Sequence, residues 1–258
     1  MDWGWHRVSK KCVLNKAGGE SFRQHQNHIL ITSMRYYPIL LDLHGKTCLV
    51  VGAGHVGRRK IQTLLSCGPA LVRIIDPKQP DQCWQELIDL GIVEYASRSF
   101  VPKDLDGCFL VIACTDHESQ NWRISRLCAE RGILCNIVDQ PEKCSFILPA
   151  LHTQGDLTIA VSTSGSSPAL AKKIRQDLGT CFGPEYGRYL SLMRQLRPLV
   201  LGLGRPTEEN SELFRKMTES ALLHAVQADD RAQVLILLKD FLPQSLHTRL
   251  EDLIHELD

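Results

Sequence analysis

The chain is 258 residues long, with 43% hydrophobic residues and a formal net charge of +1. This length suits one large domain or two smaller ones, and the near-neutral charge argues against a nucleic-acid partner. We find no run of about 18 apolar residues, so we expect no membrane-spanning helix and no membrane partner.

Ten cysteines are present, and no two of them have Cys-x-x-Cys spacing. Most fall inside apolar patterns, where cysteine packs as a small hydrophobic residue. The ten histidines are scattered and lack the spacing of a zinc site. We therefore expect a cytoplasmic protein with no disulfide framework and no metal site.

Residues 1–33 are rich in Gly, Asn, Gln and His and show no hydrophobic periodicity. They also lack the continuous apolar core of a secretory signal. We expect this segment to be disordered or non-native, with Met34 as the true start. A native extension is the alternative.

Strands and helices are predicted to alternate over the next hundred residues. Short apolar runs predict strands at 47–51, 71–75, 92–95, 109–113 and 133–138, and helical spacing predicts helices at 56–67, 81–90 and 120–130. Alternation on short connections is typical of an α/β fold, here a Rossmann-type doubly wound parallel sheet.

The pattern changes after Pro149. One more strand is predicted at 157–161, followed by a loop of small residues and a helix that begins at Pro168 with Ser167 as its N-cap. From Tyr186 onward only helical patterns occur, including 213–226, 232–242 and 246–257. These predict a C-terminal all-helical domain at 186–258.

A glycine-rich motif, G-x-G-x-x-G, lies between the first strand and the first helix. Gly52 permits a tight turn, Gly54 allows the backbone to approach a pyrophosphate, and Gly57 lets the helix pack against the strand. Asp76 ends the second strand, where a carboxylate binds the ribose 2′-hydroxyl of NAD and disfavours the 2′-phosphate of NADP. A purely structural turn is the alternative. The motif predicts NAD contacts by Gly52, Gly54, His55, Val56, Gly57 and Asp76.

Polar residues follow the fourth and fifth strands. Thr115 and Asn121 are candidates for the nicotinamide side of the cleft, because ligands bind at the carboxyl ends of parallel strands. Asn136 and Asp139 come at the end of the fifth strand, where a carboxylate can act as a general base. Turn and cap roles are the alternative for each of them, and a turn is the commoner role for an Asp before Gln-Pro.

Five motifs together resemble one known family, the precorrin-2 dehydrogenases, which form the N-terminal module of siroheme synthases. The motifs are Tyr36-Tyr-Pro-Ile-Leu-Leu-Asp-Leu, Val50-Val-Gly-Ala-Gly-His-Val-Gly-Arg-Arg-Lys, Asn136-Ile-Val-Asp-Gln-Pro, Cys144-Ser-Phe-Ile-Leu-Pro and Ser162-Thr-Ser-Gly-Ser-Ser-Pro-Ala-Leu-Ala. The resemblance runs from about Met34 to about Asp177.

The resemblance implies oxidation of precorrin-2 to sirohydrochlorin with hydride transfer to NAD, by a homodimer. It makes residues 34–149 the NAD-binding Rossmann domain and 150–185 a dimerisation and substrate segment. It implies that Asp139 is the general base. The implied substrate-binding residues are Asn136, Ser162, Thr163, Ser164, Gly165 and Ser166.

The sequence departs from the family in two ways. Bifunctional relatives often carry a pair of glycines where this chain has Ser164-Gly165. The chain also has no room for the methyltransferase domain that is fused in some siroheme synthases, so we expect methylation to be done elsewhere.

Three alternative functions stay open at this point. The first is a bifunctional dehydrogenase and ferrochelatase, because some family members also insert ferrous iron. The second is an NAD(H)-sensing regulatory module, and the third is a scaffold without catalysis.

Overall fold

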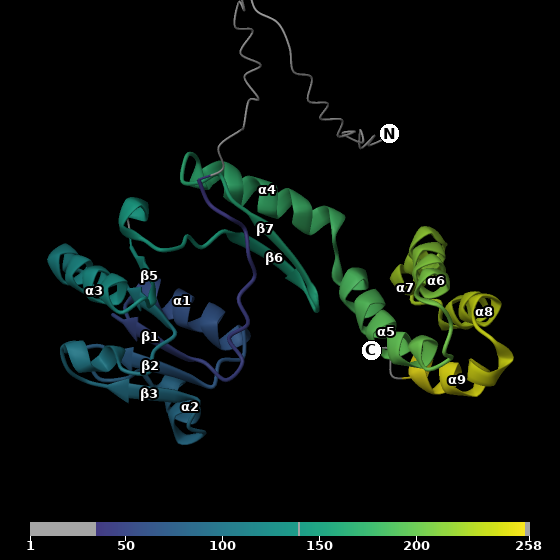
Figure 1. Cartoon of the computed structure of the whole chain (residues 1–258), viewed down its shortest axis with the longest axis horizontal. Coiled ribbons are helices and arrows are strands. Elements are labelled where there is room, and N and C mark those ends of the chain that lie inside the picture. The colour runs from purple at the N-terminus through teal and green to yellow at the C-terminus, as the bar shows by residue number, and fades with distance from the viewer. Residues whose placement is uncertain (1–34, 139, 256–258) are drawn as a thin grey trace, which may run out of the picture. The chain divides into compact units, whose positions relative to one another are not determined.

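The computed structural model describes residues 35–138 and 140–255 (Figure 1). Residues 1–33, Met34 and Asp139 lie outside the described residues, so the predictions made for them stay predictions. The elements follow in the order β1 (Thr47–Val51), α1 (His55–Ser66), β2 (Leu71–Ile75), α2 (Gln85–Asp89), β3 (Val93–Ala96), β4 (Leu110–Ala113), α3 (Glu118–Glu130), β5 (Leu134–Ile137), β6 (Ala150–Gln154), β7 (Leu157–Val161), α4 (Pro168–Cys181), α5 (Pro184–Leu201), α6 (Thr207–Glu219), α7 (Leu222–Gln227), α8 (Arg231–Phe241) and α9 (His247–His255).

The first five strands form one parallel sheet in the order β3-β2-β1-β4-β5. This confirms the predicted Rossmann-type fold. Because β1 lies between β2 and β4, the chain reverses its direction of winding at the carboxyl end of β1. Ligands of doubly wound folds bind at such a switch point.

Helices cover both faces of this sheet. On one face Val50 and Ile74 pack with Ile61 and Leu64 of α1. On the other face Leu49, Val111 and Ala113 pack with Ile124 and Cys128 of α3. Since both sides of the central strands β1 and β4 are buried, these two strands are continuous apolar runs rather than alternating ones.

The strands β6 and β7 form a separate antiparallel hairpin, with α4 and α5 in contact with it. Its turn approaches α5 closely: a Cβ on Gly155 would come within 3.2 Å of the Gly187 Cα. Gly155 also has φ +55°, a conformation that favours glycine. Helix α4 begins at Pro168 with Ser167 as its N-cap, as predicted.

The helices α5 to α9 enclose their own hydrophobic core. Leu192 and Leu196 of α5, Met217 of α6, Leu222 of α7 and Leu238 of α8 are fully buried in it. This agrees with the predicted all-helical character of the region. No helix of the described residues is long and apolar enough to cross a membrane.

Two features of the C-terminal half differ from the prediction. The strand β6 was not predicted, because its buried residue is His152, whose Nε2 lies 2.7 Å from the Phe182 carbonyl oxygen. The prediction of a single helix at 213–226 is wrong, since the helix is interrupted at Ser220. The Ser220 hydroxyl donates to the Met217 carbonyl (2.7 Å) and accepts from the Leu222 N–H (3.1 Å), which ends α6 and starts α7.

A buried carboxylate stabilises the connection between β3 and β4. Asp104 is 6% exposed and accepts hydrogen bonds from Arg98 (2.6 and 2.9 Å) and from the Val101 N–H (2.8 Å). Burial by itself raises the pKa of Asp104, but these bonds outweigh it and hold the pKa below its usual value. The folded chain therefore favours the ionised form.

We expect Asp104→Asn to lower the free energy of unfolding by about 1–2 kcal/mol near neutral pH, because a charge-assisted pair is lost. The contribution is present above the unfolded pKa of about 4 and fades as the pH falls through the lower folded value. Thermal unfolding between pH 7 and pH 3 measures it. Asp106→Asn is the control, since Asp106 forms an exposed pair with Arg131. Equal losses in both variants would contradict the assignment.

Candidate functional site

The three glycines of the motif have different surroundings at the carboxyl end of β1. Gly52 has φ +99°, and a Cβ there would lie 2.6 Å from the Cys114 carbonyl oxygen. A Cβ on Gly57 would overlap the Gly52 carbonyl oxygen. A Cβ on Gly54, by contrast, would meet no protein atom within 4 Å. Packing thus requires glycine at 52 and 57, whereas position 54 faces open space of the kind a pyrophosphate needs.

Helix α1 begins directly after this loop. Its N-cap, Gly54, provides no side-chain hydrogen bond, and no acidic residue lies in the first turn. The first amide groups of the helix therefore keep their donor capacity and the positive end of the helix dipole. His55 and Val56 are exposed at this end. The arrangement suits an anion such as a dinucleotide phosphate.

Cys114 is a site residue that is absent from the predicted contacts. Its thiol donates to the Gly52 carbonyl oxygen (3.1 Å), the same oxygen that Gly57 approaches. Burial raises the pKa of Cys114 to about 11. It therefore stays a protonated hydrogen-bond donor that holds the glycine loop in place.

Asp76 connects the end of β2 to the glycine loop. One carboxylate oxygen accepts from the Ala53 N–H (2.6 Å) and the other from the Lys78 N–H (2.8 Å). The side chain is partly exposed. A carboxylate at this position can accept a hydrogen bond from a ribose hydroxyl beside the loop.

Arg58 lies on the first turn of α1 and points toward the segment after β2. It forms an ion pair with Asp81 and lies over the Trp84 ring, with its Cζ 5.9 Å from the ring centroid. It also donates to the Cys83 sulfur at 3.7 Å. The guanidinium therefore lies on the β2 side of the glycine loop, the side to which Asp76 also belongs.

Thr115 and Asn121 are hydrogen-bonded to each other at the carboxyl end of β4. The Asn121 side-chain oxygen accepts from the Thr115 N–H (3.1 Å) and hydroxyl (2.8 Å), and its amide nitrogen donates to the Thr115 carbonyl (2.9 Å). Asn121 is 5% exposed. These bonds fix the loop after β4, and direct cofactor contact by either residue stays a prediction.

Asn136, at the end of β5, is buried in a similar network. Its oxygen accepts from the Lys60 ammonium (3.0 Å) and its nitrogen donates to the Phe146 carbonyl (3.0 Å). The side chain thereby links α1 to the segment after β5. Its predicted contact with substrate is untested, and Asp139, three residues on, lies outside the described residues.

The loop after β7 is built on left-handed backbone. Ser164 has φ +52° and Gly165 has φ +87°, which explains why a pair of glycines suits these positions. The Ser162 hydroxyl accepts from the Ser164 N–H (3.1 Å), and the Thr163 hydroxyl accepts from the Ser167 N–H (3.1 Å). The loop is ordered by these local bonds, and its predicted contacts with substrate stay predictions.

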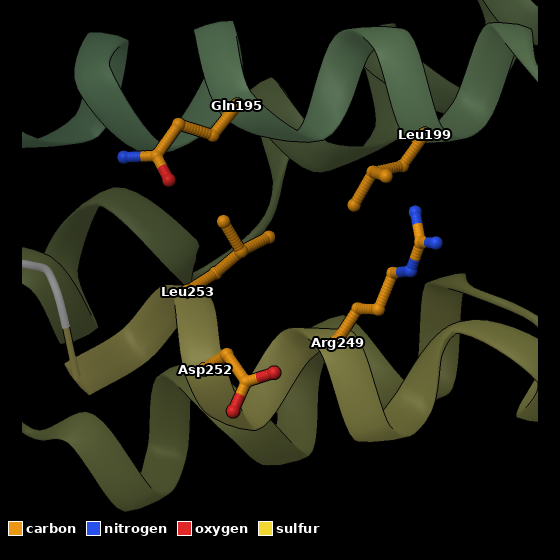
Figure 2. Close-up of a pocket in the computed structure, with 5 residues that line it drawn as sticks. All are labelled: Gln195, Leu199, Arg249, Asp252 and Leu253. Carbon is orange, nitrogen blue, oxygen red and sulfur yellow. The ribbon is translucent and has the colours of Figure 1, made fainter.

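The helical region carries two hollows that were not predicted from the sequence. Figure 2 shows the smaller, about 420 Å³, where Gln195 and Leu199 of α5 face Arg249, Asp252 and Leu253 of α9. The larger, about 650 Å³, is lined mainly by α5 and α6 and contains apolar residues with two arginines. Among the described residues, no group of three or more His, Cys, Asp and Glu side chains is arranged to hold a metal.

Comparison with known proteins gives two family matches in sequence order. A model described as "Putative NAD(P)-binding" matches residues 39–150, and one described as "Sirohaem biosynthesis protein central" matches residues 154–179. The first match covers the sheet with the glycine loop, and the second covers the hairpin turn, β7, the loop after β7 and nearly all of α4.

Three curated relatives are each named siroheme synthase. The protein from Nitrosococcus oceani is 41% identical over 60% of this chain and 33% of its own length. Those from Thioalkalivibrio sulfidiphilus and Pseudomonas fluorescens are each 34% identical, over 84% and 79% of this chain and 44% of their own length. The chain thus spans less than half the length of these curated relatives.

A solved structure named "SirC, precorrin-2 dehydrogenase" shares the fold. The match covers 86% of this chain and all of the other, with a TM-score of 0.63 and 22% sequence identity. This likeness shows the fold, while the two family matches and the curated relatives support the resemblance found in the sequence. Over residues 39–179 the chain is therefore similar to siroheme biosynthesis proteins, and it matches part of the length of the siroheme synthases.

Proposed function

We propose that this chain oxidises precorrin-2 to sirohydrochlorin and passes a hydride to NAD⁺. The observation that carries the proposal is the glycine loop with Asp76, in an NAD(P)-binding domain directly followed by the sirohaem-biosynthesis segment. In the balanced reaction, precorrin-2 loses a hydride and a proton, and NADH and sirohydrochlorin form.

The residues at the switch point fit the dinucleotide. The open space at Gly54 and the uncapped amides of α1 suit the pyrophosphate, and the Asp76 carboxylate suits the adenosine ribose. Bound NAD⁺ supplies the hydride acceptor. The bonds between Thr115 and Asn121 keep the loop after β4 fixed beside this cleft.

We assign to Asp139 the role of general base, which accepts the proton that the substrate releases, on the basis of the family resemblance. The position follows β5, whose carboxyl end lies next to that of β4 in the sheet. The Lys60–Asn136–Phe146 chain of hydrogen bonds holds the backbone on both sides of this position. A carboxylate there accepts the proton that the substrate releases as the hydride leaves.

The substrate carries many carboxylates, and the loop at 162–166 offers groups that suit them. Hydroxyl donors of Ser162, Ser164 and Ser166 are exposed, and the loop precedes the N-terminus of α4. Helix N-termini favour anions. We therefore assign this loop to substrate binding.

A second copy of the chain is the partner that we propose for the hairpin. Helix α4 covers the face that holds His152, and the opposite face presents Leu151, Thr153, Thr158 and Ala160, all of them exposed and uncharged. A two-stranded sheet alone is marginally stable. Pairing of this face with its copy would supply the missing cover, and we place the resulting homodimer in the cytoplasm.

The direct test of the proposal is anaerobic turnover of precorrin-2 with NAD⁺, followed by the absorbance of sirohydrochlorin and NADH. We expect the wild-type chain to form both products in equal amounts. Asp139→Asn should lower kcat by at least about 100-fold, because general-base catalysis is typically worth that much, while NAD⁺ affinity stays unchanged.

Wild-type NAD⁺ binding without sirohydrochlorin formation would contradict the proposed substrate and favour the NAD(H)-sensing alternative. Full activity of Asp139→Asn would contradict the assigned base. Adding ferrous iron to the product in the same assay tests the ferrochelatase alternative separately.

The dimer is tested by light scattering after size-exclusion chromatography. We expect the wild type to be a dimer at micromolar concentration and Ala160→Glu to be a monomer, because pairing would bury an unpaired carboxylate. Gln176→Glu, on the exposed surface of α4, adds the same charge away from this face and should leave the dimer intact. A monomeric wild type or a dimeric Ala160→Glu would contradict the proposal.

A further inference from the structure

Asp76 and Arg58 stand on the same rim of the glycine loop, although they come from different elements. Tyr95 of β3 lies beside the segment that holds Asp76: its hydroxyl donates to the Lys78 carbonyl (3.1 Å), and the Lys78 N–H donates to Asp76. Burial raises the pKa of Tyr95, the Asp76 charge raises it further, and the Arg58 charge lowers it. Asp76 and Arg58 thus both border the segment that follows β2, Asp76 through the Lys78 N–H and Arg58 through Asp81 and Cys83.

Arg58 is not directed at the glycine loop itself. Its guanidinium pairs with Asp81, lies over Trp84 and reaches the Cys83 sulfur. Trp84 is 4% exposed and belongs to the core beneath α1, so it is a rigid support. Asp81, in contrast, has 58% of its side chain exposed and lies on the connection between β2 and α2.

These charges matter for the ribose that Asp76 is placed to bind. The 2′-phosphate of NADP is accommodated in many dinucleotide-binding folds by an arginine near this position. Here the Asp76 carboxylate occupies the ribose-binding position, and Arg58 is already paired with Asp81, while Lys78 is a further cation on the same segment. The Asp76 carboxylate repels a dianionic phosphate, and the Asp81 carboxylate competes with that phosphate for Arg58.

We infer that Arg58 is a cofactor-specificity residue and that its pairing with Asp81 withholds it from the 2′-phosphate of NADP. Asp76 is then one of two barriers against 2′-phosphorylated dinucleotides, and Asp81 is the second. The inference rests on the proposed binding of NAD, but it does not depend on precorrin-2 being the substrate.

The ion pair between Arg58 and Asp81 is weak enough for a phosphate to take the place of Asp81. Ion pairs between exposed side chains contribute little to stability, so removing Asp81 costs the fold little. Removing it leaves the Arg58 guanidinium on its Trp84 support without that carboxylate. A phosphate beside position 76 then offers two charge-assisted hydrogen bonds to the planar guanidinium.

The experiment compares the affinities of NAD⁺ and NADP⁺, which differ only in the 2′-phosphate, by isothermal titration calorimetry. Five proteins are used: the wild type, Asp76→Ser, Asp76→Ser with Asp81→Asn, that double variant with Arg58→Gln, and a control described below. The hydroxyl introduced by Asp76→Ser can still accept from the Lys78 N–H, which favours folding of the variants, and thermal unfolding checks this. Asp76→Asn replaces Asp76→Ser if the latter does not fold.

We expect the wild type to bind NAD⁺ more tightly than NADP⁺, and Asp76→Ser to lower this ratio of affinities. Adding Asp81→Asn should tighten NADP⁺ binding by a further fivefold or more, since about 1 kcal/mol corresponds to that factor. Arg58→Gln should abolish the gain, and salt should weaken it. Asp177→Asn, which breaks the exposed pair with Lys173 on α4, is the matched control added to Asp76→Ser and should bring no gain.

The inference is overturned if Asp81→Asn leaves the NADP⁺ to NAD⁺ affinity ratio unchanged, or if the gain survives Arg58→Gln. Failure of the wild type to bind either nucleotide would overturn the proposed NAD binding and this inference together. Binding of NAD⁺ without precorrin-2 turnover would overturn only the proposed substrate.

Discussion

The close approach of three backbone segments around the Gly52 carbonyl oxygen is the constraint on which the site depends. Helix α1 packs so near to this oxygen that position 57 has no room for a side chain, and the Cys114 thiol donates to it from the end of β4. Because the oxygen is enclosed in this way, the loop after β1 has one conformation. That conformation places the first amides of α1 at the switch point of the sheet.

The polar side chains around the loop form two groups, one charged and one made of buried amides. On the β2 side, Asp76 joins the loop to the end of its strand, and Arg58 and Asp81 pair beside it. On the β4 and β5 side, the buried amides of Asn121 and Asn136 join their neighbours through hydrogen bonds. The first group suits recognition of a nucleotide, and the second holds the backbone beside which the proposed proton transfer takes place.

Much of the Rossmann-type domain was predictable from the sequence, because its signals are local. The strands β1 and β2 are apolar runs that end at a turn, and their observed bounds match the predicted ones. The glycine spacing likewise predicts the loop. The start of α4 was predictable for the same reason, since Ser167 and Pro168 are local signals of a helix N-terminus.

The missed features depend on residues that are distant in the sequence. Cys114 contacts a carbonyl 62 residues away, and Arg58 pairs with a residue 23 positions further on, so no local pattern indicates either partner. The strand β6 buries a histidine whose bonding partner lies beyond α4. The buried networks of Asn121 and Asn136 are also tertiary, and a polar residue after a strand does not reveal whether it faces a ligand or its own backbone.

The central claim is that the glycine loop binds a dinucleotide, and Gly54→Val tests it most directly. Gly54 has φ −63°, which any residue adopts, and a Cβ there would meet no protein atom within 4 Å. Replacing Gly by Val at an N-cap costs about 1 kcal/mol, so we predict a melting temperature about 2–4 °C below that of the wild type. We also predict loss of NAD⁺ binding in calorimetry. Unchanged NAD⁺ affinity in a folded Gly54→Val chain would contradict the account.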